Sequence, residues 1–254
     1  MTELQPFLEF ALDAIFQSGQ VTLGYFQTSL EIERKADASP VTLADKNAEQ
    51  LLRRLVEERF PDHGIIGEEF GEYASDAEWT WIIDPIDGTK SFISGVPLYG
   101  CLIALVRNRQ PVLGVMHFPA LKETIYAAKG QGCFWNGRRT RVSHVSSLND
   151  AVLLASEINL FDRAQRRAQF DRLVAGTLFQ RTWGDAYGYA LVATGRADIM
   201  IDPIMKVWDC APMQVILEEA GGTFTDWRGE PTIWASESVA TNSKLYKDVL
   251  ALLS

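Results

Sequence analysis

The sequence predicts an α/β protein whose N-terminal half is α+β and whose C-terminal half is a layered α/β unit. In the first half, two stretches with helical periodicity precede a series of short runs rich in β-branched and aromatic residues. After Ser143, strand-like and helix-like segments alternate, which is typical of a sheet covered by helices. We place the two halves at residues 1–142 and 143–254. They are expected to share an interface, because no Pro- or Ser-rich linker separates them.

The N-terminal half begins with two helices. Apolar residues recur at helical spacing from Leu4 to Phe16, which predicts an amphipathic helix from residue 2 to about residue 27. The polar residues 33–40 predict a loop, and Thr42 opens a second helix that ends before Pro61. Short runs separated by Gly, Pro and Asn then predict strands over 80–84, 100–106, 111–118 and 123–129, followed by a hairpin over 129–139.

The C-terminal half alternates between the two kinds of element. Branched apolar runs predict strands over 151–156, 197–202 and 238–242. Segments with helical spacing predict helices over 163–176, 188–195 and 211–222.

The charge and residue composition of the chain disfavour several kinds of binding partner and metal site. The 254 residues include 24 basic and 33 acidic side chains, a net charge of -9, which disfavours nucleic acid and anionic membranes as partners. The N-terminal residues lack a basic region followed by an apolar one, so we expect a cytoplasmic protein. Three dispersed cysteines and three scattered histidines favour neither a zinc cluster nor a Ser-His-Asp triad. Any metal site is therefore expected to use oxygen ligands.

Two acids follow an apolar run in the stretch "WIIDPIDGTKSF", residues 81–92. The run before Asp84 predicts a buried strand, and Pro85 prevents that strand from continuing regularly. Asp84 and Asp87 would thus lie at the carboxyl end of the strand, where two convergent carboxylates repel each other unless a cation neutralises them.

The same stretch can hold a cation and a phosphate side by side. Mg²⁺ takes oxygen ligands, and the backbone carbonyl of Ile86 lies between the two acids. Gly88 permits a close approach of the backbone, and "DGTKSF" is typical of the first turn of a helix, whose free N–H groups suit a phosphate. The alternative is an ordinary loop, because Asp-Pro and Asp-Gly are common turn-formers.

Other acids strengthen the metal interpretation. Glu68 and Glu69 follow the apolar run in "GIIGEEFGE", and Asp209 follows a short apolar approach in "VWDCAP". Taken separately, the glutamates could form a solvated loop, and Asp209 could cap a helix that begins at Ala211 or Pro212. Together these acids supply the oxygens that a site with several metal ions needs.

These motifs resemble the inositol monophosphatase superfamily of magnesium-dependent phosphomonoesterases. The resemblance rests on "GEE", "WIIDPIDGT" and "WDCAP...EEAGG" and extends over nearly the whole chain. It implies the layered αβαβα sandwich of the inositol monophosphatase and sugar phosphatase type. The stretches "DPIDGTKSFISGVPLYGCLIAL", "WGDAYGYALVATGRADIMIDP" and "FTDWRGEPT" are more similar to the histidinol-phosphate phosphatase branch. In the inositol enzymes "TNF" would replace Lys90-Ser91-Phe92.

The resemblance also implies roles for the acids. Glu68, Asp84 and the Ile86 carbonyl would bind one Mg²⁺, and Asp84, Asp87 and Asp209 a second, with a third, looser ion near Glu68. The ions would activate a water for in-line attack on phosphorus without a phospho-enzyme.

The remaining roles lie around these ligands. The backbone amides of Gly88 and Thr89 would hold the phosphate. Asp45, with the Thr89 hydroxyl, would orient the attacking water, although Thr42-x-x-Asp45 is also a capping box pattern. Glu69 would orient water or ligands.

The substrate of this branch, histidinol phosphate, carries an ammonium and an imidazole, so its pocket needs further acceptors. Asp185 and Asp202 are the candidates, with a helix cap and a turn acid as the respective alternatives. Other small phosphate esters remain open as substrates: inositol phosphate, a nucleotide 3′-phosphate or fructose bisphosphate. The resemblance further implies a homodimer.

Overall fold

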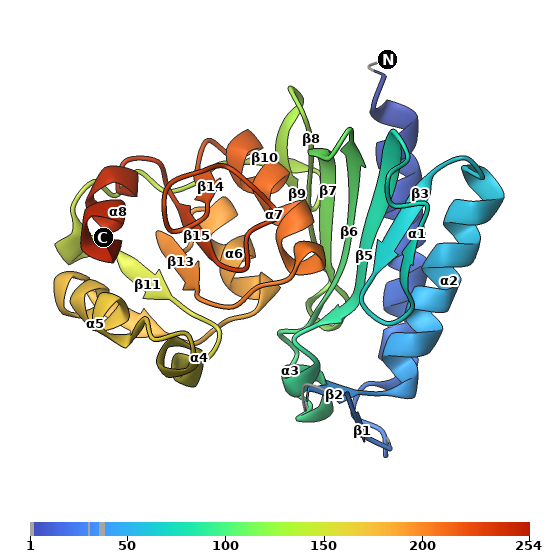
Figure 1. Ribbon diagram of the computed structural model, residues 1–254, viewed down its shortest axis with the longest axis horizontal. Coiled ribbons are helices and arrows are strands. Elements are labelled where there is room, and N and C mark those ends of the chain that lie inside the picture. The colour runs from blue at the N-terminus through green and yellow to red at the C-terminus, as the bar shows by residue number, and fades with distance from the viewer. Residues whose placement is uncertain (1–2, 30, 36–38) are drawn as a thin grey trace.

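The computed structural model describes residues 3–29, 31–35 and 39–254, and their helices and sheets form five layers (Figure 1). A pair of helices covers one face of a large sheet, a second pair lies between this sheet and a smaller one, and three helices cover the outer face of the smaller sheet. This order confirms the α/β class and the layered αβαβα sandwich.

The first layer consists of α1 (Gln5–Tyr25) and α2 (Leu43–Arg59), which lie along the large sheet in Figure 1. In α1, Leu8, Ala11 and Ile15 are buried, which is the predicted apolar stripe facing the sheet. Thr42 is the N-cap of α2, as its sequence position indicated.

The second layer is a sheet of eight strands. These are β3 (Gly64–Gly67), β4 (Gly71–Tyr73), β5 (Trp79–Asp87), β6 (Gly100–Arg107), β7 (Gln110–Phe118), β8 (Glu123–Ala128), β9 (Gly132–Trp135) and β10 (Arg138–Thr140). Their order is β10-β9-β8-β7-β6-β5-β3-β4, and all neighbours are antiparallel except β3 and β5. The four predicted strands and the hairpin are confirmed, whereas β4 was not predicted.

The central layer consists of α6 (Ala186–Ala193) and α7 (Val207–Glu219). Both helices are almost entirely buried because a sheet covers each side of the layer. The contact with the large sheet is close: a Cβ atom on Gly114 of β7 would lie 2.4 Å from the Pro212 carbonyl oxygen of α7. Val207 and Trp208, expected as an extended approach to Asp209, instead form the first turn of α7.

The smaller sheet and its outer helices complete the sandwich. The strands are β11 (Val152–Leu154), β12 (Phe179–Arg181), β13 (Ile199–Asp202), β14 (Thr223–Thr225) and β15 (Ser238–Thr241), in the order β12-β11-β13-β15-β14. The helices are α4 (Ile158–Arg163), α5 (Arg167–Gly176) and α8 (Tyr246–Leu253). The helix predicted over 163–176 is confirmed for residues 167–176, which form α5, but its start is wrong because the backbone breaks at Gln165, whose φ is 56°. β12, β14 and α8 were not predicted.

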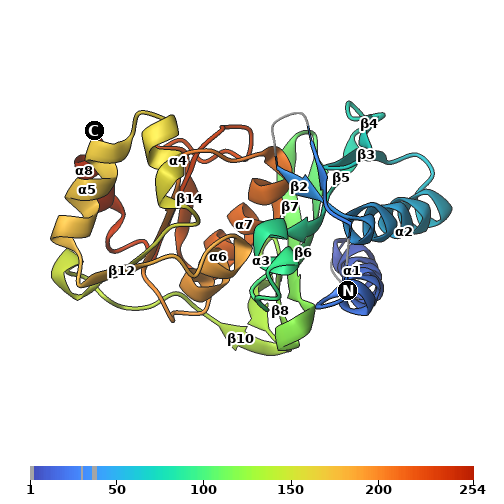
Figure 2. The same cartoon turned by 90° about the horizontal axis from the view of Figure 1, so that it is seen from below.

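Short elements connect the layers near one end of the molecule. β1 (Glu33–Arg34) pairs with β2 (Pro40–Val41) in the segment that was predicted to be a loop; residues 36–38 lie outside the described part of the chain. Figure 2 shows α3 (Thr89–Ile93) at this end, close to β2. Single 3₁₀ turns occur at Pro119–Leu121 and Leu148–Asp150.

The strands of the large sheet end at Thr140, and those of the small sheet begin at Val152. The division of the chain at residues 142 and 143 stays a prediction. Within the described residues, no helix is long and apolar enough to cross a membrane.

Candidate active site

Asp84, Asp87 and Asp209 converge, although they come from distant parts of the chain. The pairing of β5 with β6 shifts by one residue between Asp84 and Asp87, which is a bulge that redirects the end of the strand. Asp209 is the third residue of α7, and its Oδ2 accepts a hydrogen bond from the Lys206 N–H at 2.8 Å. Carboxylate oxygens of the three residues all lie within 4.8 Å of one another. The alternative that Asp209 is the N-cap of a helix beginning at Ala211 or Pro212 is wrong, because the helix begins at Val207.

Full ionisation of this cluster would need a positive charge nearby. Burial raises the pKa of Asp84 and of Asp87 well above their usual range, and neighbouring carboxylates add to the effect. The pKa of Asp209 is raised to about 7, again mainly by burial. Three carboxylates this close cannot all be ionised without a counter-charge. Their oxygen donors and their spacing fit a hard divalent cation.

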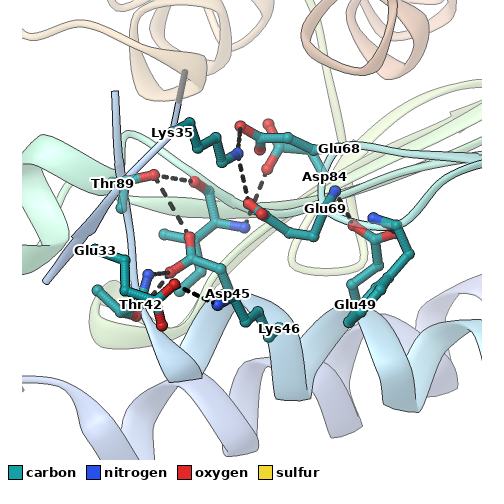
Figure 3. A network of polar contacts seen from close by, with 12 residues as sticks. Glu33, Lys35, Thr42, Asp45, Lys46, Glu49, Glu68, Glu69, Asp84 and Thr89 are labelled. Atoms are coloured by element: carbon teal, nitrogen blue, oxygen red, sulfur yellow. Dashed lines mark hydrogen bonds and ion pairs between the residues drawn. The ribbon is translucent and has the colours of Figure 1, made fainter. Parts of the chain in front are cut away.

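Glu68 and Glu69 lie at the same edge of the large sheet as Asp84, because β3 runs parallel to β5. Lys35 Nζ lies 2.7 Å from Oε1 of each glutamate, as Figure 3 shows. The Glu69 side chain is only 5% exposed, and burial raises its pKa to about 7 although Lys35 opposes the shift. A freely solvated acidic loop is therefore the wrong description of this segment.

Asp45 caps the N-terminus of α2 with one carboxylate oxygen and approaches Thr89 with the other. Its Oδ2 accepts hydrogen bonds from the Thr42 N–H at 2.8 Å and the Thr42 hydroxyl at 2.7 Å, which is the capping box that the spacing predicted. Its Oδ1 lies 3.5 Å from the Thr89 hydroxyl, which also lies 3.2 Å from the Ile86 carbonyl oxygen (Figure 3). Burial raises the pKa of Asp45. The capping and the catalytic interpretation are compatible, because Oδ2 makes the capping contacts and Oδ1 approaches Thr89.

Asp185 approaches the end of β5 from the central layer. A Cβ atom on Gly88 would lie 2.8 Å from Asp185 Oδ2, and Gly88 has a φ of 82°, so both the space and the backbone require glycine there. Asp185 precedes α6 with an unusual φ of 54°, and its N–H donates to Ser156 Oγ at 3.1 Å. Asp185 occupies the N-cap position of α6, as the cap alternative expected, but its side chain makes no capping hydrogen bond. The next residue, Ala186, donates its N–H to Asp87 Oδ2.

Asp202 lies deeper than Asp185. Its side chain is 1% exposed, and it accepts hydrogen bonds from the Ser156 N–H at 3.0 Å, the Ser156 hydroxyl at 3.0 Å and the Tyr189 hydroxyl at 2.9 Å. Burial raises its pKa to about 7. Asp202 borders a cavity of about 90 Å³ that Asp87, Asp185 and Asp209 also line. It is therefore a buried neighbour of the cluster rather than an isolated turn acid.

A cleft of about 550 Å³ lies next to the cluster, because Asp185 lines both this cleft and the small cavity that Asp87 and Asp209 border. Its described lining includes Glu68, Gly88 and Thr89 at one end and Glu157 and Asp185 on the side of the smaller sheet. Lys90 is the only basic residue among the described residues that line it, and its ammonium forms an ion pair with Glu157 across the cleft. The cleft therefore joins a region of anionic oxygen ligands to a second acidic region.

Comparison with known proteins agrees with this geometry. Residues 3–254 match the model of the inositol monophosphatase family. The chain belongs to the inositol monophosphatase family. It is 42% identical to a histidinol-phosphatase from Chlorobaculum parvum, over 98% of this chain and 97% of that one. It is 38% identical to a histidinol-phosphatase from Mycobacterium tuberculosis, over 89% of this chain and 88% of the relative. The structure of an inositol monophosphatase from Zymomonas mobilis superposes with a TM-score of 0.91 at 31% identity, covering 100% of this chain and 99% of that one.

Members of the inositol monophosphatase family are metal-dependent phosphatases that act on small phosphate esters, and the buried acidic cluster of this chain is consistent with that chemistry. The sequence patterns missed three residues around the cluster: Lys35, Glu49 and Glu157. A signal existed only for Glu49, which follows Asp45 by four positions and so lies on the same face of α2. The other two contact the site through the tertiary fold, and no local pattern marks them.

Proposed function

We propose that this protein is a Mg²⁺-dependent phosphomonoesterase that hydrolyses L-histidinol phosphate to L-histidinol and phosphate. The observation that carries the proposal is the juxtaposition of the Asp84, Asp87 and Asp209 carboxylates with a cleft whose far side is also acidic. The similarity to histidinol-phosphatases over nearly the full chain supports the choice of substrate. On the same resemblance we place the enzyme in histidine biosynthesis, as a cytoplasmic homodimer.

Two groups of ligands are proposed for the ions. Asp84, Asp87 and Asp209 would hold one Mg²⁺, and their raised pKa values are the reason that a cation is favoured there. Glu68, Asp84 and the Ile86 carbonyl would hold another. Glu68 forms an ion pair with Lys35. A Mg²⁺ bound by Glu68, Asp84 and the Ile86 carbonyl would therefore compete with the Lys35 ammonium for the Glu68 carboxylate.

The residues around the ions have distinct proposed tasks. Bound Mg²⁺ would lower the pKa of a coordinated water and neutralise the phosphate oxygens. The Gly88 and Thr89 amides would bind the phosphate where Gly88 leaves the backbone open. Thr89 and Asp45 would orient the attacking water, because Asp45 Oδ1 accepts a hydrogen bond from the Thr89 hydroxyl and the raised pKa of Asp45 suits a proton acceptor. Glu69 would support the ligands through its contact with Lys35.

The acidic side of the cleft is the proposed binding site for the cationic part of the substrate. Asp185 lies beside Gly88 and therefore next to the proposed phosphate site. Glu157 now pairs with Lys90, and a substrate ammonium or imidazolium could take the place of the Lys90 ammonium. Asp202 would act from behind Asp185, since its carboxylate oxygens already accept hydrogen bonds from Ser156 and Tyr189.

Inositol-1-monophosphatase activity is the second candidate, because a solved structure of similar fold is that of an inositol monophosphatase. An uncharged polyol would donate hydroxyl hydrogen bonds to the carboxylates on the acidic side of the cleft but would form no ion pair. Ion pairs with Asp185 and Glu157, at up to about 1 kcal/mol each, should favour the cationic substrate by roughly 10- to 30-fold in kcat/KM.

The test is phosphate release from L-histidinol phosphate and from inositol 1-phosphate, each with Mg²⁺ and with EDTA. We expect Mg²⁺-dependent release with the preference for histidinol phosphate given above. Asp84→Asn is the control and should abolish release from both esters. A preference for inositol 1-phosphate would support the second candidate, and equal rates in EDTA would contradict the metal centre itself.

A further inference from the structure

Glu49 is a buried acid beneath the turn that carries Glu68 and Glu69. Its side chain is fully buried on α2. Its Oε2 accepts the Glu69 N–H at 2.7 Å, and its Oε1 accepts the Phe70 N–H at 3.2 Å. Figure 3 shows this carboxylate lying between the helix and the Glu69 segment.

The turn packs closely against Glu49. A Cβ atom on Gly67, the last residue of β3, would lie 2.0 Å from Glu49 Oε1. The backbone immediately before Glu68 therefore lies directly against the carboxylate, and the two N–H groups that follow Glu68 donate to it. Glu68 is thus held on both sides by contacts to one side chain.

The buried charge of Glu49 is compensated locally. Arg53, one turn further along α2, donates from Nε to Glu49 Oε1 at 2.7 Å, and the two amide donors account for the remaining hydrogen bonds. A carboxylate provides two acceptor oxygens in a fixed fork, which matches two successive backbone N–H groups. A neutral amide side chain in its place has one acceptor oxygen and a donor group.

Glu49 also connects two parts of the proposed metal centre. It follows Asp45 by four residues, so both acids project from the same face of α2. Asp45 faces Thr89, whereas Glu49 fixes the backbone of Glu68. One helix therefore sets the positions of two segments that approach the cluster from different directions.

We propose that Glu49 is a positioning residue that orients Glu68 for metal binding. This inference rests on the proposed metal centre. Residues that orient metal ligands commonly change metal affinity about 10- to 100-fold when they are replaced. We therefore expect Glu49→Gln to weaken metal binding by about tenfold, because the amide loses one backbone donor and the partner of Arg53.

The experiment is a titration with Mn²⁺, in which electron paramagnetic resonance measures the free ion. The Glu49→Gln variant should show about a tenfold higher dissociation constant than the unchanged protein. The Mg²⁺ concentration for half-maximal phosphate release should rise by a similar factor, with a change in kcat below about threefold at saturating Mg²⁺. Glu58→Gln is the matched control, because Glu58 lies on the same helix and pairs with Arg54 at the surface. Its Mn²⁺ binding should not change.

The outcomes separate the possible roles. A folded Glu49→Gln protein with unchanged Mn²⁺ affinity overturns the proposal. If that protein also has a lower melting temperature in EDTA, Glu49 has a structural role only. Should Glu49→Gln not fold, Glu49→Asp keeps the charge and shortens the reach, and it should still bind Mn²⁺ more weakly. Failure of both variants to fold also overturns a positioning role. If the unchanged protein binds no Mn²⁺, the metal centre itself is wrong; if it binds and Glu49→Gln binds equally well, only the role of Glu49 is wrong.

Discussion

Replacing Asp209 by Asn should stabilise the metal-free protein while it abolishes the phosphatase activity. The Asp209 carboxylate lies within 4.8 Å of carboxylate oxygens of Asp84 and Asp87, and its pKa is raised to about 7. At pH 7.5 the charge is therefore present in the folded protein at a cost in stability. Asparagine has nearly the same shape and keeps an oxygen that can accept the Lys206 N–H, now bonded at 2.8 Å.

The size of the effect follows from the shift. A pKa raised from 3.8 to about 7 corresponds to roughly 4 kcal/mol at about 1.36 kcal/mol per unit. Asp209 is only partly buried, and the remaining acids share the repulsion, so we expect about 1–3 kcal/mol of stabilisation. For a chain of this length that is a rise of about 3–9 °C in Tm.

The assay is thermal unfolding followed by circular dichroism at pH 7.5, in EDTA and in saturating Mg²⁺. Asp209→Asn should melt at a higher temperature than the unchanged protein in EDTA, and it should lose most of the additional stabilisation by Mg²⁺. Its phosphate release should fall at least about 100-fold, because one proposed metal ligand is missing. Asp76→Asn, at an exposed position, is the control and should change neither quantity. An unchanged or lower Tm in EDTA would refute the idea that these carboxylates repel one another in the folded chain.

Three further predictions concern the same site. In EDTA the Tm should fall as the pH rises from 5.5 to 7.5. Acids such as Asp202 and Asp209, whose pKa values are raised to about 7, contribute stability that is present at low pH and lost as the pH rises through the folded pKa. A Tm that rises over this interval would contradict the raised pKa values as the cause. Asp45→Asn should lower kcat by about 10²- to 10³-fold and leave the Mn²⁺ affinity nearly unchanged. Its Tm should also change little, because an amide oxygen can still accept the Thr42 N–H. A kcat within about threefold of the original argues against a role in proton transfer. Glu157→Gln should raise KM for histidinol phosphate about 5- to 10-fold without affecting KM for inositol 1-phosphate. The surface variant Glu78→Gln is the control. An equal effect on both esters would show that Glu157 does not select the substrate.

The sequence predicted the elements of the site that are local in the chain. The strand that carries Asp84, its irregularity between Asp84 and Asp87 and the helical turn after Gly88 are all present, because they depend on residues next to one another. The capping box of Thr42 and Asp45 likewise lies within four consecutive residues. The expected start of the helix after Asp209 was wrong: the partly buried Val207 and Trp208 pack against the core and form the first turn of α7.

Contacts between distant segments could not be predicted from such patterns. Glu157 and Lys90 are separated by 67 residues, and they pair only because α3 and α4 face each other across the cleft. The break at Gln165 depends on one backbone torsion that no apolar periodicity reveals. Strands such as β12 and β14 have three residues each, which is too short for a period-two pattern to be distinguished from a loop.

The packing of the central helices α6 and α7 fixes the relative positions of the acids in the cluster. α6 and α7 begin at the cluster, where the Ala186 N–H binds Asp87 and α7 carries Asp209. Beyond the end of α6, Arg196 pairs with Glu123 of β8 at 2.9 Å and lies over the Trp135 ring at 4.3 Å. The central layer is thus fixed to the large sheet both at the cluster and away from it. A cation at the cluster would bind ligands from β5 and α7 together, so its binding energy would also stabilise the packing of the central layer on the large sheet.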